Sequence, residues 1–213
     1  FQEQATCAGT DDPRSDPAIG LHFARENFET LLSAPVDTES QAAVRRLQTQ
    51  SETGHSDSLT LLEQRRALGR VREGHGDLHL GNLVLLGDTV LPFDAIEFND
   101  KLRWIDVASD VAFLWMDLIA HDQMGLANWL CSEWLDASGD ADAAQVWTLF
   151  ATYRALVRAK VQALGASQAG ADHATAIRAM DECRRYIELA NRIAWPPAPR
   201  LIITHGLSGS GKS

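Results

Sequence analysis

The sequence predicts an α+β protein that is mostly helical. Long segments carry apolar residues at the spacing of a helix face, whereas the short apolar runs 83–86 and 90–93, separated by Gly-Asp-Thr, predict a β-hairpin. A third observation concerns the last residues, where an apolar run precedes GLSGSGKS. This order predicts the first strand and the phosphate-binding loop of a second, truncated α/β domain.

Composition limits the classes of protein and partner. The 213 residues, 45% of them hydrophobic, can form one globular domain and part of another. The net charge of −10 argues against non-specific binding to nucleic acids or anionic membranes, because both require a basic surface. The three cysteines lie far apart, and no apolar run is long enough to cross a bilayer. We therefore expect a cytoplasmic protein without nucleic-acid or membrane partners.

Helical periodicity and capping residues predict seven helices, followed by a linker. The predicted helices span 17–34, 37–50, 56–69, 104–120, 126–138, 142–164 and 173–194. The proline-rich stretch 195–200 predicts a stiff linker between a domain over 1–194 and the start of a P-loop domain over 201–213. We expect the chain to be a fragment of a longer protein, because it begins with Phe1 and stops where the helix after a P-loop should begin.

The predicted helix 104–120 carries an acidic stripe. Asp106, Asp110 and Asp117 fall on one narrow face, and nearly all other positions are apolar. A helix that is apolar on almost every side is buried, so its acidic face should meet something polar. The alternative is a solvent-exposed strip in which Asp106 only caps the helix.

The stretch HGDLHLGNLVLLGDTVLPFD, residues 75–94, combines polar side chains with the hairpin, which we expect to be buried. Asn82 and Asp94 lie six residues to either side of Asp88, so the turn should place them opposite each other with Cβ atoms about 5 Å apart. An amide oxygen and a carboxylate at this spacing can share one Mg²⁺ ion. Asn82 and Asp94 are therefore predicted metal ligands.

Asp77 lies five residues before Asn82, in the loop that leads into the hairpin. If the metal holds a nucleotide phosphate, Asp77 is placed to accept the proton of an attacking hydroxyl, as phosphoryl transfer requires. The order H-x-D-x-x-x-x-N, hairpin and Asp is that of the catalytic half of a protein-kinase-like site. The alternative is that His75, Asp77 and Asn82 only stabilise a tight turn.

These motifs resemble those of a known family. HGDLHLGN, FDAIEFND and WIDVASDVAFLWMDL are similar to motifs of the aminoglycoside phosphotransferase-like kinases. With YRALVRAKV at 153–161, they most resemble the subgroup whose kinase-like domain is fused to a C-terminal P-loop kinase-like domain. The resemblance covers roughly residues 20–165 and implies a protein-kinase-like C-lobe, with the hairpin at its active site, that uses ATP and Mg²⁺.

The resemblance also implies a role for each residue of the motif. Asp77 would be the catalytic base, and Asn82 and Asp94 would be the magnesium ligands. His75 would brace the loop. Asp110 would hydrogen-bond the loop backbone from a buried helix, which would give the acidic stripe its polar counterpart.

The segment after the hairpin departs from the family pattern. Asp94 is followed by Ala-Ile-Glu rather than by Phe-Gly or Phe-Glu, so Glu97 has no assigned role. His79 is expected to brace the loop rather than to line an acceptor pocket.

A second departure concerns lysine, which occurs only at positions 101, 160 and 212. No lysine upstream of Asp77 can therefore clamp ATP. We expect the N-lobe to lie outside this chain, and the chain by itself to be inactive.

The C-terminal motif GLSGSGKS matches G-x-x-x-x-G-K-[ST] and follows the apolar run LIIT. Its backbone N–H groups would cradle phosphates, Lys212 would reach the β- and γ-phosphates, and Ser213 would bind Mg²⁺. The alternative is a flexible Gly/Ser tail. The predicted nucleotide-binding residues of this P-loop are Gly206, Gly209, Gly211, Lys212 and Ser213.

We expect an ATP-dependent phosphotransferase (a kinase) that acts on a hydroxyl of a small-molecule acceptor, with a second nucleotide-binding domain downstream. One alternative is a non-catalytic kinase-like module that senses nucleotide or binds a partner for the P-loop domain, and another is transfer of AMP. The sequence does not name the acceptor, although the acidic balance weakly favours a cationic one. Arg154 and Arg158 share a helix face that could meet a phosphate or carboxylate, with ordinary ion pairs as the simpler expectation.

Overall fold

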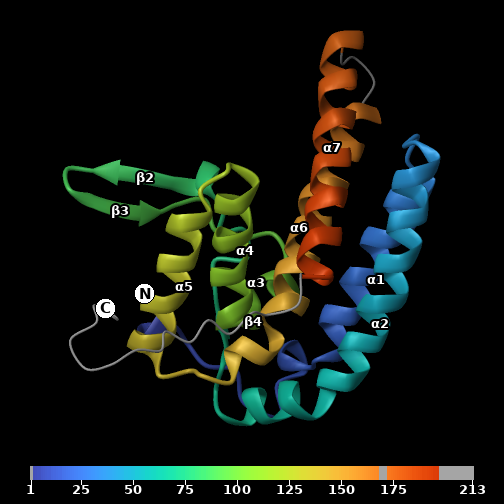
Figure 1. Cartoon of the computed structure of the whole chain (residues 1–213). Helices are drawn as coiled ribbons and strands as arrows, with labels where there is room; N and C mark the ends of the chain where they lie inside the picture. Colours follow the sequence, from blue (N-terminus) through green and yellow to red (C-terminus); the bar gives the residue numbers. More distant parts are fainter. Residues whose placement is uncertain (1, 168–171, 197–213) are drawn as a thin grey trace, which may run out of the picture.

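The protein is mostly helical and has two small antiparallel sheets, which confirms the predicted α+β class (Figure 1). The computed structural model describes residues 2–167 and 172–196. Its helices and strands are α1 Ala18–Ser33, α2 Thr38–Ala67, β1 Val71–Glu73, β2 Leu83–Leu86, β3 Thr89–Pro92, α3 Asp100–Arg103, β4 Trp104–Asp106, α4 Val107–Ala120, α5 Met124–Ser138, α6 Ala143–Ser167 and α7 His173–Ala194.

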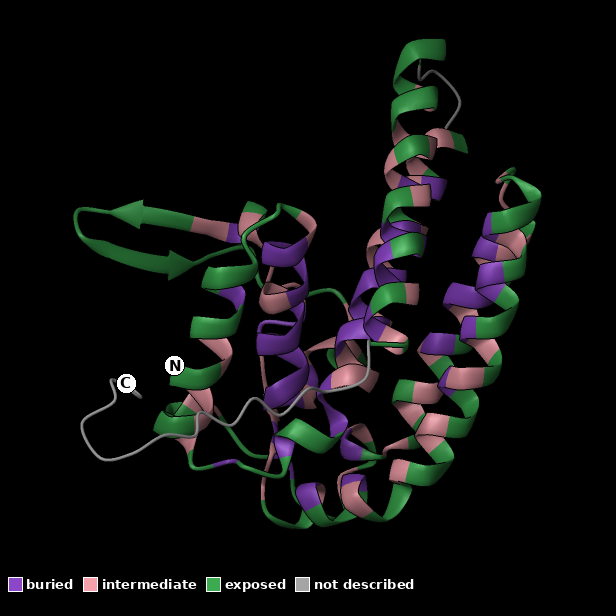
Figure 2. Ribbon diagram, viewed as in Figure 1, coloured by how far each residue is buried: buried purple, intermediate pink, exposed green. Residues whose placement is uncertain are grey.

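Helix α4 lies between α5 and α6 and forms the centre of the core. Beyond it, α6 packs against α7 and α1, and α1 packs against α2. Ala108, Ala112, Phe113 and Met116 of α4 are fully buried, and Figure 2 shows buried residues along most of this helix. The central position explains why α4 is apolar on nearly every side.

The predicted helices 37–50 and 56–69 form one continuous helix, α2, so the predicted break between them is wrong. The intervening sequence SETGHSDS contains residues of low helix propensity. Tertiary packing outweighs this propensity, because the backbone at Gly54 lies against α6. A Cβ atom at Gly54 would be only 3.7 Å from Cδ1 of Leu149.

The predicted helix 104–120 consists of two elements, strand β4 and helix α4. Strand β4 pairs antiparallel with β1, with Val71 opposite Asp106 and Glu73 opposite Trp104. Neither strand was predicted from the sequence. Both strands have three residues, which is too short for periodicity to reveal them. The other predicted helices, at 17–34, 126–138, 142–164 and 173–194, are confirmed within a few residues.

The acidic stripe is buried, so the alternative of a solvent-exposed strip is wrong. Asp106, Asp110 and Asp117 are 8%, 0% and 1% exposed. Asp106 does cap α4, since it accepts a hydrogen bond from the Ala108 N–H at 2.9 Å. The carboxylate of Asp106 also binds a buried cation, Arg65 of α2.

Arg65 forms a buried ion cluster that joins α2 to β4 and to the segment before α6. Its guanidinium is 1% exposed and donates to both oxygens of Asp106, at 2.7 and 2.8 Å, and to both oxygens of Asp140, also at 2.7 and 2.8 Å. Paired bonds of this kind offset the cost of removing the cation from water. Without Arg65, two buried carboxylates would lose their main counter-charge.

The hairpin β2–β3 extends away from the helices and is exposed, whereas we predicted a buried hairpin (Figures 1 and 2). Leu85, Leu86 and Val90 are 66%, 59% and 59% exposed. The sheet has only two strands, and among the described residues no layer covers either of its faces. Apolar sequence alone therefore did not determine burial here.

The predicted elements beyond residue 196 lie outside the described residues. They comprise most of the linker 195–200, the strand 201–204 and the P-loop residues Gly206, Gly209, Gly211, Lys212 and Ser213. Across residues 2–167 and 172–196, no helix combines the length and the hydrophobicity needed to cross a bilayer.

The variant Arg65→Met should lower the free energy of unfolding by roughly 3–5 kcal/mol, because it leaves Asp106 and Asp140 buried with their counter-ion removed. Urea unfolding of the variant and the parent protein measures this difference. Arg45→Met, at an exposed position of the same helix, is the matched control and should change stability by no more than about 0.5 kcal/mol. Equal stabilities of the two variants would contradict a supporting role of the cluster.

Candidate active site

The loop over residues 74–82 connects β1 to β2, and Asp110 of α4 positions its first part. The fully buried Asp110 carboxylate accepts hydrogen bonds from the backbone N–H groups of His75 at 2.7 Å and Gly76 at 2.9 Å. Burial raises the pKa of the Asp110 carboxyl, and the positive charge of Arg154 and these two hydrogen bonds only partly oppose that effect. The backbone contact that the resemblance implies for Asp110 is thus present in the structure.

Two glycines let the loop approach this carboxylate closely. A Cβ atom at Gly74 would lie 2.6 Å from Oδ2 of Asp110, which is closer than real Cβ atoms come to other atoms. Gly76 has φ of +82°, and a Cβ atom there would lie 2.7 Å from the Leu102 carbonyl oxygen. Both positions therefore require glycine, for reasons of space at Gly74 and of space and backbone conformation at Gly76.

His75 connects the loop to the segment after the hairpin. Its imidazole is almost fully buried, Nδ1 accepts the Asp77 N–H at 3.3 Å, and Nε2 lies 2.8 Å from the Phe93 carbonyl oxygen. Since Nδ1 accepts, Nε2 carries the proton and donates to Phe93. The His75 carbonyl in turn accepts the Ile96 N–H at 3.0 Å, so a single residue connects the loop to residues 93–96.

Asp77 presents a partly exposed carboxylate that neighbouring side chains hold in place. Its side chain is 39% exposed, the Asn82 amide nitrogen donates to its Oδ2 at 3.2 Å, and His79 Nε2 lies 3.4 Å from the same oxygen. Burial alone would raise the pKa of Asp77, but the hydrogen bond and charge of His79 and the charges of Arg154 and Arg158 outweigh this effect and lower the pKa from its ordinary value. The carboxylate is therefore ionised at neutral pH and can accept a proton or a hydrogen bond.

The register of the hairpin differs from the prediction by one residue. Leu83 pairs with Pro92 and Leu86 with Thr89, and the Phe93 N–H donates to the Asn82 carbonyl at 3.0 Å. Asn82 thus faces Phe93, and the prediction that it faces Asp94 is wrong. The reason is that only two residues form the turn, the first of which is a glycine with positive φ.

Asp94 nevertheless lies next to the loop. Its neighbours Phe93 and Ile96 both hydrogen-bond His75, and Asp94 itself has φ of 61°, which turns the chain as it leaves the strand. Its carboxylate is exposed. Successive hydrogen bonds connect Asp110 to His75, His75 to Asp77 and Asp77 to Asn82, and among the described residues none connects Asp94 to these four side chains.

Asn82 and Asp94 each leave one oxygen donor that could hold a magnesium ion together with water or phosphate. Within the described ranges, no three Asp, Glu, His or Cys side chains converge as a metal site. The amide nitrogen of Asn82 faces Asp77, and no described group donates to its amide oxygen, which leaves that oxygen available. One amide oxygen and one exposed carboxylate at Asp94 are few ligands, which is typical of magnesium bound together with substrate phosphates.

Comparisons with known proteins do not assign a function to this site. No protein-family model matches the chain, and no solved structure matches it. Over 188 residues the chain is 30% identical to uncharacterized proteins of Mycobacterium tuberculosis, strains H37Rv and CDC 1551, and of Mycobacterium bovis. The aligned region covers 88% of this chain and 36% of each relative, so the chain spans about a third of the length of the curated relatives it matches.

Asp117, the second acidic residue of α4, holds the second half of the loop. Asp117 Oδ2 accepts the Leu80 N–H at 2.9 Å, and the Tyr186 hydroxyl of α7 donates to Oδ1 at 3.2 Å. Helix α4 therefore binds the loop at two points, on either side of Asp77. The sequence placed Asp117 on the acidic face but carried no signal for Tyr186, because only packing brings α7 to this site.

Arg154 and Arg158 of α6 lie at the same site and do not form the ordinary ion pairs that we expected. Arg154 Nη1 donates to the Gly76 carbonyl at 2.8 Å, and its Nε lies 3.2 Å from the Ser109 hydroxyl oxygen. The Arg158 guanidinium lies over the ring of Tyr186, 5.5 Å from its centroid. Among the described residues, no carboxylate oxygen lies within 4.0 Å of either guanidinium.

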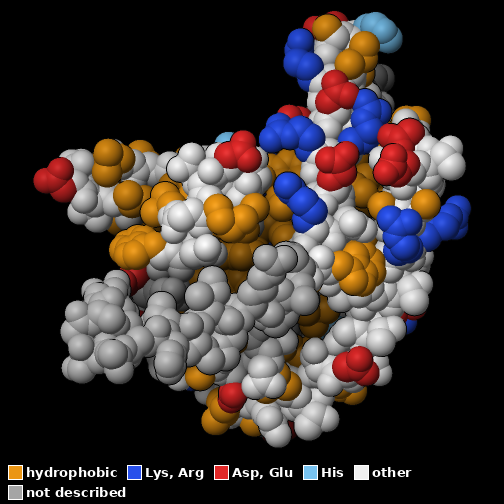
Figure 3. Space-filling view, in the orientation of Figure 1, with side chains coloured by type: hydrophobic (Ala, Val, Ile, Leu, Met, Phe, Trp, Pro, Cys, Tyr) orange, Lys and Arg blue, Asp and Glu red, His pale blue; other side chains and the backbone are white. Residues whose placement is uncertain are grey.

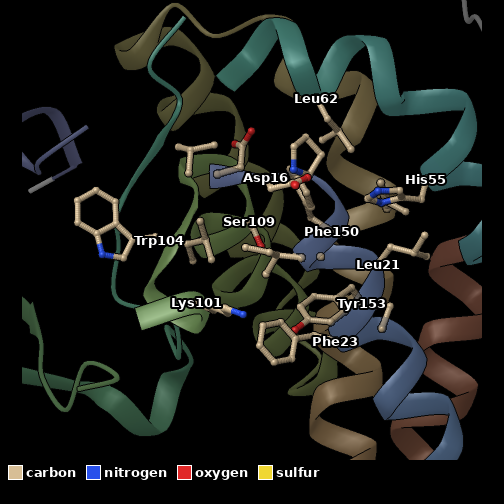
Figure 4. A pocket seen from close by; sticks show the side chains of 18 of the residues that line it. Asp16, Leu21, Phe23, His55, Leu62, Lys101, Trp104, Ser109, Phe150 and Tyr153 are labelled. Atoms are coloured by element: carbon tan, nitrogen blue, oxygen red, sulfur yellow. The ribbon is translucent and has the colours of Figure 1, made fainter. Parts of the chain in front are cut away.

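A cavity of about 120 Å³, which Arg154 also lines, lies between α1, α2, α6 and the α3–β4 segment (Figure 4). Apolar and aromatic side chains such as Phe23, Phe150 and Tyr153 form most of its lining, with His55 and Lys101 among the polar members. Burial lowers the pKa of His55, and the charge of Arg25 adds to this effect. Asp77 does not line this cavity.

The variant Asp110→Asn should lower the free energy of unfolding by about 1–3 kcal/mol, because the amide offers one acceptor where the carboxylate offers two, so one buried backbone N–H loses its partner. Chemical unfolding measures the loss, and hydrogen exchange at His75 and Gly76 should accelerate. The matched control is Asp136→Asn, at an exposed position of α5. Unchanged exchange at both amides would show that Asp110 does not hold the loop.

Proposed function

We propose that this chain carries the catalytic residues of an ATP-dependent phosphotransferase of the aminoglycoside phosphotransferase-like type, which moves a phosphoryl group to a hydroxyl of a small molecule. The observation that supports it is the position of Asp77: an ionised, partly exposed carboxylate in a loop that a buried helix holds on both sides. In a reaction of this kind, a positioned carboxylate accepts the proton of the attacking hydroxyl.

The surrounding contacts suit that role. Asn82 donates to both the backbone and the side-chain oxygens of Asp77, at 3.0 and 3.2 Å, which restricts the orientation of the carboxylate. His75 and Asp110 fix the backbone on its N-terminal side. A general base works only at hydrogen-bond distance from its proton, so rigid positioning contributes directly to the rate.

Magnesium is the metal that the available donors suit. Asn82, through its amide oxygen, and Asp94, through its exposed carboxylate, would hold it. When bound, the ion would offset the negative charge of the nucleotide phosphates.

The proposal requires further contacts to ATP from the full-length protein. No lysine precedes Asp77 in this chain, and Lys160 donates to the Asn27 side-chain oxygen at 2.9 Å, away from the loop. The P-loop motif at 206–213 would form a second nucleotide site, with Lys212 and Ser213 as its phosphate and magnesium contacts.

The variant Asp77→Asn, made in the full-length protein, should reduce acceptor-dependent phosphoryl transfer by about 10²–10⁴-fold, because it removes the base. The Lys212→Ala background removes ATP consumption by the P-loop domain. Mass spectrometry of the product separates phosphoryl transfer from transfer of AMP.

Asp136→Asn is the matched control and should leave the rate unchanged. Full activity of Asp77→Asn in the Lys212→Ala background would overturn the proposal. Nucleotide binding without turnover, in the parent protein and in both variants, would support a nucleotide-sensing module instead.

A further inference from the structure

We propose that the acceptor carries an anionic group, a carboxylate or a phosphate, which Arg158 and the Nη2 group of Arg154 bind beside Asp77. This inference rests on the proposed function, because it names the class of acceptor for the same site.

The two arginines lie on one face of α6, four residues apart, and both guanidinium charges act on Asp77. Arg154 donates to the carbonyl of Gly76, the residue before Asp77, at 2.8 Å. Arg158 lies over Tyr186, whose hydroxyl binds Asp117, the carboxylate that in turn accepts the Leu80 N–H. Arg154 thus contacts the loop directly, whereas Arg158 lies over Tyr186 and reaches the loop only through the Tyr186–Asp117 contact.

Both guanidinium groups have unused hydrogen-bond donors. Arg154 Nη2 and Arg158 Nε are buried and have no acceptor among the described residues. Arg65, the other buried arginine, uses its donors on two carboxylates. Buried charged groups are normally paired. An unpaired donor has lost its hydrogen bonds to water, and no hydrogen bond within the protein offsets that loss. An anion with two or three acceptor oxygens would supply the missing partners.

The local charge also favours an acceptor with a negative charge. The positive charges of Arg154 and Arg158 act on Asp77 without a direct ion pair to it. A cationic acceptor at this position would meet two guanidinium groups, whereas an anionic one would be attracted by them. The net charge of −10 describes the whole chain and does not decide this local preference, so the weak expectation of a cationic acceptor is replaced.

Arg158 is the residue on which the test should be made. It is partly exposed, and its buried Nε has no acceptor among the described residues. Arg154 is 4% exposed and supports the Gly76 carbonyl, so its replacement would disturb the loop as well as the proposed anion site.

The first experiment measures binding and does not depend on activity. Full-length parent protein, Arg158→Gln and the control Arg45→Gln are titrated with inorganic phosphate, and the midpoint of thermal unfolding is followed. The Kd for phosphate at the proposed site should rise about tenfold to a hundredfold in Arg158→Gln, since a charge-assisted hydrogen bond is lost. Phosphate bound at the P-loop would stabilise all three proteins equally and cancels in the comparison. Equal stabilisation of all three by phosphate would overturn the inference.

The second experiment measures transfer from ATP to matched sets of hydroxyl compounds, each with a neutral, a carboxylated and a phosphorylated member, such as glycerol, glycerate and glycerol 3-phosphate. The anionic members should be preferred over the neutral one. Comparing the carboxylated with the phosphorylated member then shows which of the two anionic groups the site binds. Arg158→Gln should raise KM for the preferred member about tenfold or more, Arg158→Lys should raise it less, and KM for ATP should not change.

The outcomes separate this inference from the proposed function. Asp77-dependent transfer to neutral or cationic acceptors, with a KM that Arg158→Gln leaves unchanged, would overturn the inference and leave the proposed function intact. Phosphate binding that depends on Arg158, in a protein without any Asp77-dependent transfer, would support the anion site and contradict the proposed function.

Discussion

The buried carboxylate of Asp110 is the contact on which the geometry of the candidate site depends. It lies in the first turn of α4, in the centre of the core, and accepts the N–H groups of His75 and Gly76. The loop therefore takes its position from the buried core of the molecule. Burying a carboxylate away from water costs free energy, and here the charge of Arg154 and two backbone N–H donors offset part of that cost. The same contact explains Gly74, where a side chain would collide with Asp110.

The acidic face formed by the end of β4 and by α4 has three carboxylates with three different partners. Asp106 caps the helix and binds Arg65, Asp110 binds the start of the loop, and Asp117 binds Leu80 and receives the Tyr186 hydroxyl. Each carboxylate has hydrogen-bond partners within the protein, which is why so apolar a helix and its N-cap can carry three buried acids. The arrangement ties α2, α7 and the loop to one central element, so the stability of the core and the shape of the site are linked.

The arginines of the core form two kinds of contact. Arg65 is enclosed by carboxylates and stabilises the fold, whereas Arg154 and Arg158 keep unused donors next to the loop. On the face of the molecule drawn in Figure 3, charged side chains are prominent along α7 and hydrophobic ones along the β2–β3 hairpin. The proposed chemistry lies between these regions, where polar groups from α4, α6 and α7 converge on a single loop.

Sequence alone determined the helical class, the apolar character of α4, the hairpin and the polar loop before it. These features depend on residue spacing and turn residues within short segments of the chain. Sequence alone could not determine the register that moves Asp94 away from Asn82, since one residue in a turn decides it. Strands β1 and β4, the continuous α2 and the exposed hairpin also depended on partners distant in the chain. Only the tertiary structure brought Arg65 to Asp106 and Tyr186 to Asp117, because a buried polar side chain is specified by what packs against it, and no local pattern records that.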